Sequence, residues 1–334
     1  MPFSEILNQP AAIAYLQKSI LGRVPQALLF CGPSGIGKKK TALAFAKALN
    51  CLDPQARQTG DSCGVCAHCR AIEQGTYPDV VIADFLYQAR LELKTEPTDP
   101  AYEEDLEKEL SKQQRIKVDT IRDITAKSQQ KSATGGWKVF IVDEAQTMQA
   151  EAANALLKFI EEPSQKTVWI LLTDKKASML KTILSRCQPL QFAPLPVQTV
   201  EQLLRQTHPE IENPTAAAKL SDGSVTRAAR AAEALELLQT TDVNDPAWPT
   251  AVAMQLPRTP ALARQQAQAV LDVLISVLHR AWLPETDHVR QQQLQQLLKK
   301  IETYKIAVMR NVSPSIVLET ALMRVSALHM QLLD

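Results

Sequence analysis

The chain has 334 residues, of which 45% are hydrophobic and 22% are charged, and its formal net charge is +1. This composition is typical of a globular protein with two or three domains, and the near-zero charge excludes a chain-wide attraction to nucleic acid or to a membrane surface. The first residues carry no secretory pattern, and no run approaches the roughly eighteen apolar residues of a membrane span. We therefore expect a cytoplasmic protein without a membrane partner.

Residues 1–197 alternate strand-like apolar runs with helical patterns, a rhythm typical of a parallel sheet covered by helices. The expected strands are ALLFCG (27–32), DVVIAD (79–84), KVFIVDEA (138–145), TVWILLTD (167–174) and PLQFAP (189–194). The acidic, weakly patterned segment 84–114 interrupts this rhythm. We expect it to be a solvated surface insertion with some helix.

The prolines at 194 and 196 end the sheet pattern and place a domain boundary near residue 197. Residues 198–240 indicate a small domain of short helices, followed by a proline-bearing break over 242–249. Helical periodicity over 261–283, 289–309 and 315–333 predicts an all-helical domain at 241–334. The predicted fold is α/β followed by all-α. Val270, Leu274 and Leu278 recur at a spacing of four, which suits packing within that domain or in an oligomeric collar.

The stretch after the first strand, GPSGIGKKK, follows the phosphate-loop pattern up to one position. The residues that fill the pattern are Gly32, Gly35, Gly37 and Lys38. A hydroxyl that binds Mg²⁺ should come next, but Lys39 stands there. Thr41 lies roughly 200° further around a helix and is expected to point away. The pattern favours nucleotide binding without efficient hydrolysis, or an empty site, over an ordinary strand-turn-helix corner.

KVFIVDEAQ predicts a buried strand that ends in two carboxylates. In a nucleoside triphosphatase, Asp143 would help to hold the metal and Glu144 would orient the attacking water. Acidic pairs at strand ends also occur by chance. The position of this pair after a phosphate loop is the reason to interpret it as part of a nucleotide site.

Four cysteines form the most specific chemical pattern, with Cys63, Cys66 and Cys69 at C-x2-C-x2-C and Cys51 shortly before them. Four thiolates suit a closed, structural Zn²⁺ site in a module over residues 51–69. An iron–sulfur cluster is the competing metal, and His68 could replace one cysteine as ligand. Arg186, in LSRCQPLQF, is either a solvated surface residue or an arginine that reaches a neighbouring subunit's γ-phosphate.

In this order, the motifs resemble the clamp-loader branch of the AAA+ family, as found with bacterial DNA polymerase III. The likeness is carried by GPSGIGK, SCGVCAHC with YPDV close behind, VDEAQTMQAEAANALLKFIEEP, LLTD, LSRC and GSVTRA. It spans about residues 1–235. The resemblance implies an AAA+ P-loop domain, a small helical lid domain and a C-terminal helical collar domain.

The resemblance also implies a role for each matching residue. Nucleotide phosphates would meet Lys38, the Walker B pair would be Asp143 and a vestigial or weak Glu144, and sensors one and two would be Thr173 and Arg227. Arg186 would act in trans as an arginine finger. The zinc ligands would be Cys51, Cys63, Cys66 and Cys69.

Within this family, the departure at Lys39 resembles a stator subunit, which supplies an arginine finger but is a poor ATPase. The implied partners are clamp-loader subunits of the tau/gamma and delta types, the sliding clamp and primer-template DNA, in DNA replication. ATP remains a possible ligand. The alternative is an active tau/gamma-type motor, which we would expect to have Thr or Ser after Lys38 and a long C-terminal extension. A free-standing DNA-dependent ATPase is more distant, because an aromatic and basic strip is missing.

Overall fold

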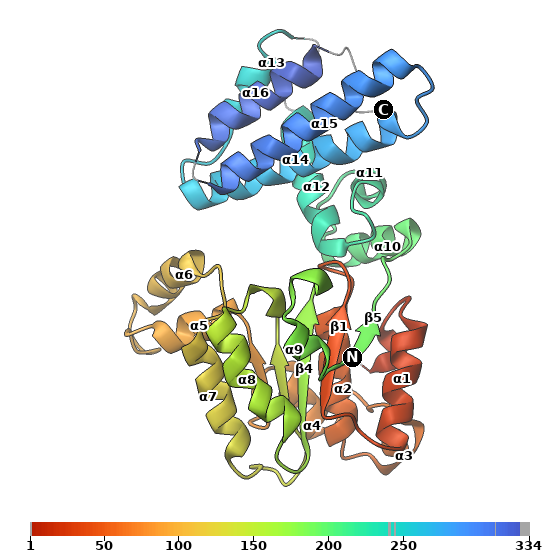
Figure 1. Cartoon of the computed structure of the whole chain (residues 1–334), viewed down its shortest axis with the longest axis vertical. Coiled ribbons are helices and arrows are strands. Elements are labelled where there is room, and N and C mark those ends of the chain that lie inside the picture. The colour runs from red at the N-terminus through yellow and green to blue at the C-terminus, as the bar shows by residue number, and fades with distance from the viewer. Residues whose placement is uncertain (1, 240–241, 244, 311, 328–334) are drawn as a thin grey trace. The chain divides into compact units, whose positions relative to one another are not determined.

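The computed structural model describes residues 2–239, 242–243, 245–310 and 312–327. The chain divides into two compact units, Met1–Pro194 and Leu195–Asp334, which are described one at a time (Figure 1). The second unit contains both helical domains that the sequence predicts, and their separation near residue 240 stays a prediction.

The first unit contains all five predicted strands. They are β1 (Ala27–Cys31), β2 (Val80–Ala83), β3 (Lys138–Val142), β4 (Thr167–Thr173) and β5 (Gln188–Gln191). They form one wholly parallel sheet in the order β2-β3-β4-β1-β5. Every residue of β1, β3 and β4 is buried, as expected for a parallel sheet with helices on both faces.

Helices connect these strands. They are α1 (Pro10–Leu21), α2 (Lys38–Asn50), α3 (Pro54–Thr59), α4 (Ala67–Glu73), α5 (Phe85–Glu92), α6 (Tyr102–Lys112), α7 (Val118–Gln129), α8 (Ala150–Glu161) and α9 (Lys181–Leu184), with 3-10 turns η1 (Phe3–Glu5), η2 (Ala145–Thr147) and η3 (Lys176–Ser178). On one face of the sheet, alternate strand residues such as Leu29 and Trp169 pack with Ile121 of α7 and Leu156 of α8. The rings of Phe140 and Trp169 stack there at 4.8 Å. This core holds the strands rigidly, so the loops at their ends have fixed positions.

The segment 84–114 contains two helices, α5 and α6, and is tied to the body of the unit (Figure 1). Gln88 of α5 is fully buried, and its amide nitrogen donates to Gln113 and to the carbonyl of Arg115. Its amide oxygen accepts from the Lys117 N–H and from the Thr120 hydroxyl, both at 2.8 Å. The segment is therefore a partly helical insertion that is anchored by buried hydrogen bonds and is not solvated throughout.

The second unit is entirely helical among its described residues. Its helices are α10 (Val197–Thr207), α11 (Pro214–Lys219), α12 (Val225–Gln239), α13 (Trp248–Met254), α14 (Pro260–Trp282), α15 (His288–Met309) and α16 (Pro314–Ser326). α13 begins inside the expected break over 242–249, because Trp248 is buried and its indole N–H donates to the Leu238 carbonyl at 3.0 Å. The end of the helix expected over 315–333 lies outside the described residues.

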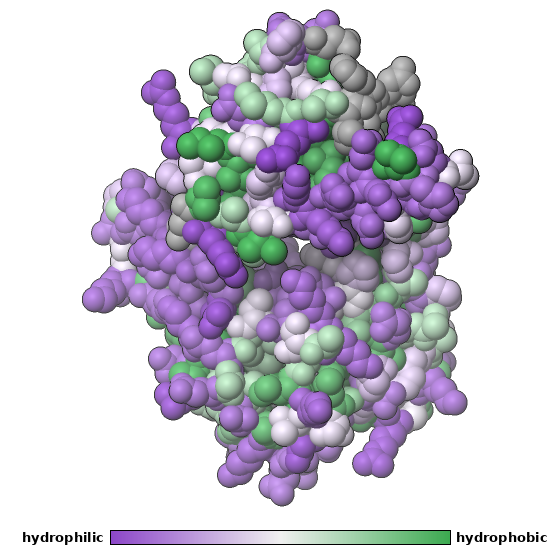
Figure 2. Space-filling view, turned by 45° about the horizontal axis from the view of Figure 1, so that its top comes forward, coloured by the Kyte–Doolittle hydropathy of each residue, from purple (hydrophilic) through white to green (hydrophobic). Residues whose placement is uncertain are grey.

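Val270, Leu274 and Leu278 are buried in the core of the second unit itself, together with residues of α15 and α16. This stripe therefore packs within the unit. Within the described ranges, no helix is long and apolar enough to cross a membrane. Figure 2 shows a mostly hydrophilic face on which hydrophobic side chains form small separate groups.

Candidate functional site

The candidate phosphate site lies at the edge where the parallel strands end. β1 runs into the loop 32–37, and α2 begins directly at Lys38. The register pairs Cys31 with Thr173 and Ala83 with Val142, so neighbouring strands end side by side. Ligands of open parallel sheets bind at this carboxyl edge.

The loop needs its glycines for conformation and for space. Gly35 and Gly37 have φ of 72° and 98°, which disfavour a side chain. At Gly32, with φ of 153°, an added Cβ would lie 2.6 Å from the Phe192 carbonyl oxygen. The Gly32 N–H donates to the Thr173 carbonyl at 3.1 Å, which fixes the loop against β4.

Lys38 is buried beneath this loop, and its Nζ donates to the carbonyls of Gly32 and Pro33, each at 2.6 Å. Burial lowers the pKa of Lys38, although Asp174 and Asp143 oppose that effect. A cation under a glycine-rich loop at a helix N-terminus is the arrangement that binds phosphate groups.

Lys39 occupies the position of the missing hydroxyl and points to two carboxylates. Its Nζ lies 2.7 Å from Asp84 Oδ2 and 3.5 Å from Asp143 Oδ2. Burial disfavours the charged ammonium, but the hydrogen bond and the negative charge of Asp84 outweigh it and raise the pKa of Lys39. Thr41 is buried, and its hydroxyl donates to the Gly37 carbonyl at 2.9 Å, so it is directed into its own helix.

Asp84 is a site residue that sequence reasoning missed. It follows β2 directly, just as Asp143 follows the adjacent strand β3, and its other oxygen accepts from the Tyr87 N–H at the start of α5. The signal was present, because DVVIAD and KVFIVD both end in an aspartate. Only the pairing of β2 with β3 brings the two carboxylates to one place.

The other predicted site residues lie in different surroundings. Asp143 is half-buried, and Glu144 follows it in a left-handed conformation with φ of 48°. Thr173 is buried at the end of β4, and its hydroxyl accepts from the Lys175 N–H at 3.1 Å. Arg227 belongs to the second unit, where it forms an exposed ion pair with Asp222 at 3.3 Å.

Arg186 lies near the amino ends of the parallel strands, whereas its own phosphate loop lies at their carboxyl ends. It precedes β5, whose residue Gln188 pairs with Leu28 near the start of β1, whereas the loop follows the end of β1. A five-residue strand separates the two edges by on the order of 13 Å. The Arg186 guanidinium is exposed, forms an ion pair with Glu161 of α8 and donates to the Thr182 carbonyl at 3.1 Å.

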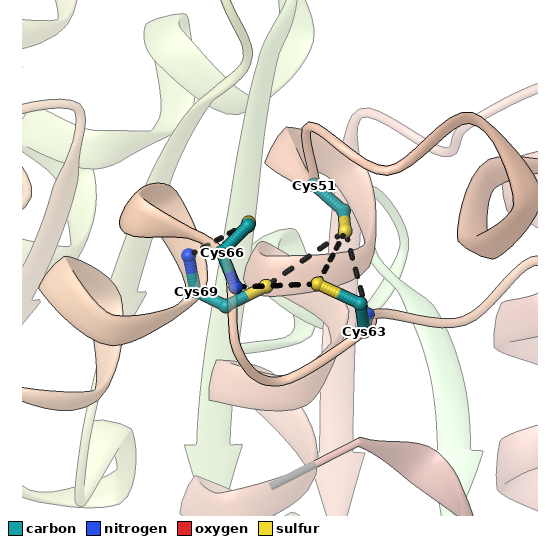
Figure 3. Close-up of side chains that lie close together, drawn as sticks. All are labelled: Cys51, Cys63, Cys66 and Cys69. Carbon is teal, nitrogen blue, oxygen red and sulfur yellow. Dashed lines mark hydrogen bonds between the residues drawn. The ribbon is translucent and has the colours of Figure 1, made fainter.

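The four predicted cysteines converge, as Figure 3 shows. Their Sγ atoms all lie within 4.8 Å of one another, and the Cys51 sulfur is 3.6 Å from that of Cys63 and 3.8 Å from that of Cys69. A tetrahedral ion with metal–sulfur bonds of about 2.3 Å places its ligands about 3.8 Å apart. The residues present therefore fit a single four-coordinate metal ion.

The thiols of the cluster differ in how readily they ionise. Burial opposes ionisation, but the backbone N–H groups of Leu52 and Cys69 prevail and lower the pKa of Cys66 to about 6. Burial raises the pKa of Cys51 and of Cys69. Binding of a metal ion is coupled to the loss of such thiol protons.

His68 is not among the residues whose ligand atoms converge. Its Nδ1 lies 2.9 Å from the Asn50 carbonyl oxygen, and its ring packs edge-on to Tyr77. The Asn50 side chain in turn accepts from the Trp137 N–H and donates to the Trp137 carbonyl just before β3. His68 thus connects the cysteine module to the body of the unit.

The fold and the loop define the class of this protein: it is an AAA+ P-loop protein with an α/β domain followed by helices. Over residues 8–196 it matches the family described as DNA polymerase III, delta subunit, and the chain belongs to that family.

Several curated proteins are similar over the first part of the chain. DNA polymerase III subunit tau of Escherichia coli (strain K12) is 31% identical over 62% of this chain and 28% of its own length. Subunit delta' is 34% identical in Bacillus subtilis (strain 168), over 59% of this chain and 51% of that protein, and 37% identical in Pseudomonas aeruginosa, over 51% and 43%. The match thus spans about half or less of each relative.

Among solved structures, a DNA polymerase III gamma subunit-related protein from Thermotoga maritima is similar in fold. Its TM-score is 0.54 and its identity 18%, with 96% of this chain and 98% of that chain covered. This likeness extends the agreement in fold to the helical part of the chain.

Proposed function

We propose that this chain is a clamp-loader stator subunit of the delta-prime kind. It would belong to the DNA polymerase III holoenzyme and help to load the sliding clamp onto primed DNA. It would supply Arg186 to a neighbouring ATPase and hydrolyse little or no ATP itself. The observation that carries the proposal is the ion pairing of Lys39 with Asp84 and Asp143.

This ion pairing removes the ligands that Mg²⁺ would need in the site. Mg²⁺ needs oxygen ligands close around it, and the loop residue that should supply a hydroxyl supplies an ammonium. Asp143, the carboxylate expected to help hold the metal, already faces that ammonium at 3.5 Å. Phosphoryl transfer relies on the metal to neutralise the developing charge, so hydrolysis here should be very slow.

The place of Arg186 supports action in trans. The residue precedes β5 and its own loop follows β1, so the two lie at opposite edges of one rigid sheet. Its guanidinium is exposed, and the ion pair with Glu161 is exposed as well. Such a pair contributes little to stability, so the guanidinium is available to a neighbour's γ-phosphate.

The test is a reconstituted complex in which the other subunits are wild type. Arg186→Ala should lower clamp- and DNA-stimulated ATP hydrolysis, since arginine fingers supply a factor of about 10³–10⁵ in well-studied cases. The loss of hydrolysis will be smaller if several ATPase sites of the complex hydrolyse ATP. Lys38→Ala should do far less. Arg122→Ala is the matched control, because Arg122 is also exposed in an ion pair, with Asp119 of its own helix.

The second candidate is an active motor subunit of the tau/gamma type, which the similarity to the tau subunit of Escherichia coli favours. The same experiment separates the two. If Lys38→Ala damaged hydrolysis by the complex more than Arg186→Ala, this chain would be a motor and the roles would be reversed.

We also infer one structural Zn²⁺ held by Cys51, Cys63, Cys66 and Cys69. Sulfur atoms that bind different irons of a cluster must be spread around it, whereas these four lie within 4.8 Å of one another. A closed set of four thiolates leaves no position for substrate. The ion would therefore hold the module of residues 51–69 to the end of α2 and the start of α4.

The remaining roles follow from the same proposal. If nucleotide binds, Lys38, Gly32, Gly35 and Gly37 would hold its phosphates, and Asp143, Glu144 and Thr173 would lie around it. Arg227 would have the role of the second sensor. The partners would be subunits of the tau/gamma and delta types, with the clamp and primer-template DNA in the assembly. The C-terminal helices would provide the contacts of a hetero-oligomer, in the cytoplasm.

A further inference from the structure

Lys39 lies between two carboxylates where related P-loops place a metal ion. We infer that its ammonium is a built-in cation that replaces Mg²⁺, so that the loop binds a nucleoside di- or triphosphate as the metal-free anion. This inference rests on the nucleotide site of the proposed function and specifies its ligand.

The two carboxylates are brought together by the backbone. Asp84 and Asp143 follow the paired residues Ala83 and Val142, and the Asp143 N–H donates to the Ala83 carbonyl at 3.0 Å. Two carboxylates so placed repel each other unless a cation lies between them. The Lys39 ammonium does so, at 2.7 Å from one and 3.5 Å from the other.

The position of the ammonium is constrained on both sides. Lys39 lies in the first turn of α2, while Asp84 Oδ1 accepts from the Tyr87 N–H and so is committed to the start of α5. An ammonium has three donors, and two carboxylates use at most two of them here. One N–H of the Lys39 ammonium therefore remains to donate to a phosphate oxygen. Unlike a hydroxyl at this position, the ammonium cannot bind a metal ion.

The charges around the loop show what the ammonium of Lys39 changes. Lys38 and Lys39 come from α2, and the acidic groups come from the ends of three strands: Asp84, Asp143, Glu144 and Asp174. With a hydroxyl at position 39, Asp84 and Asp143 would stay negative and would repel a phosphate unless Mg²⁺ bridged them. Lys39 offsets one of these two negative charges in the protein itself, and Lys38 is left to face a phosphate.

The experiment measures ATP and ADP binding to the purified full chain by calorimetry, once with EDTA and once with excess Mg²⁺. For the wild-type chain, binding should be present with EDTA and should not strengthen when Mg²⁺ is added, because excess Mg²⁺ complexes the nucleotide and removes the metal-free anion. Lys39→Thr should bind about tenfold more weakly in EDTA and recover when Mg²⁺ is added. Lys40→Thr is the matched control. Lys40 is the next residue of α2 and is exposed, and its replacement removes the same positive charge from the chain.

Three results would overturn the inference: wild-type binding that requires Mg²⁺, no binding of ATP or ADP under either condition, or a folded Lys39→Thr chain that ignores Mg²⁺. If circular dichroism shows that Lys39→Thr does not fold, the wild-type comparison alone still decides. The outcome is independent of the stator role, which depends on Arg186 and on hydrolysis by neighbouring subunits. Metal-free binding with no effect of Arg186→Ala would refute only that role.

Discussion

Replacing Cys69 by serine tests the metal module most directly. Cys69 is fully buried, and its sulfur lies 3.8 Å from that of Cys51, which is 18 positions earlier in the chain. A metal ion bound by both closes this loop as a covalent cross-link would. For a loop of that length, the closure constrains the unfolded chain by about 3 kcal/mol.

Cys69→Ser should therefore lose the Zn²⁺ and about 3 kcal/mol of unfolding free energy. In a unit of this size, each kcal/mol shifts the melting temperature by about 2–4 °C, so the midpoint should fall by about 6–12 °C. Elemental analysis measures zinc per chain, and thermal unfolding followed by circular dichroism measures the shift. A chelator should lower the midpoint of the wild type in the same way and leave the variant almost unchanged.

Cys187→Ser is the control, because Cys187 is also buried but lies outside the cluster. It should retain one zinc ion. A Cys69→Ser chain that keeps zinc and the wild-type midpoint would refute the reasoning, as would iron in the wild-type protein. Replacement of the lost ligand by His68 is not expected, since the group of ligand atoms within 4.8 Å of one another consists of the four cysteine sulfurs and includes no His68 nitrogen.

Three further substitutions test how the unit is built, each measured by denaturant unfolding. Burial alone would raise the pKa of Asp79, but hydrogen bonds from Thr134, Ala133 and Ser132 lower it below 3.8. Asp79→Asn should thus cost about 1–3 kcal/mol at neutral pH. Because a lowered pKa stabilises the fold only above the unfolded value, the two chains should converge as the pH falls below 3.8, and a constant difference would contradict this. Gly32→Ala should cost about 2–5 kcal/mol, since the new Cβ meets the Phe192 carbonyl, whereas Gly135→Ala, with open space around it, should cost about 1–2. Gln88→Leu should cost about 2 kcal/mol or more by leaving the partly buried Lys117 N–H and the buried Thr120 hydroxyl without their acceptor, and an unchanged midpoint would show that water replaces it.

Much of the fold could be predicted because its signals are local. The five strands appear as short apolar runs, and α14 and α15 appear at almost their full length from helical periodicity. The phosphate loop and the cysteine module could be found because neighbouring residues supply their groups. Groups that are close along the chain, as in the loop and in the cysteine module, stay close in space in any arrangement of the remaining fold.

The sequence by itself thus determined the class of the domain, the residues of the loop and the four thiols. Only the tertiary structure decided what Lys39 contacts, because Asp84 is 45 positions away and reaches it through the pairing of β2 with β3. The tertiary structure also decided that Arg186 lies at the edge of the sheet away from its own loop. Apolar runs predict that strands exist but not which strands are neighbours, and that order determines which charges meet at the carboxyl edge.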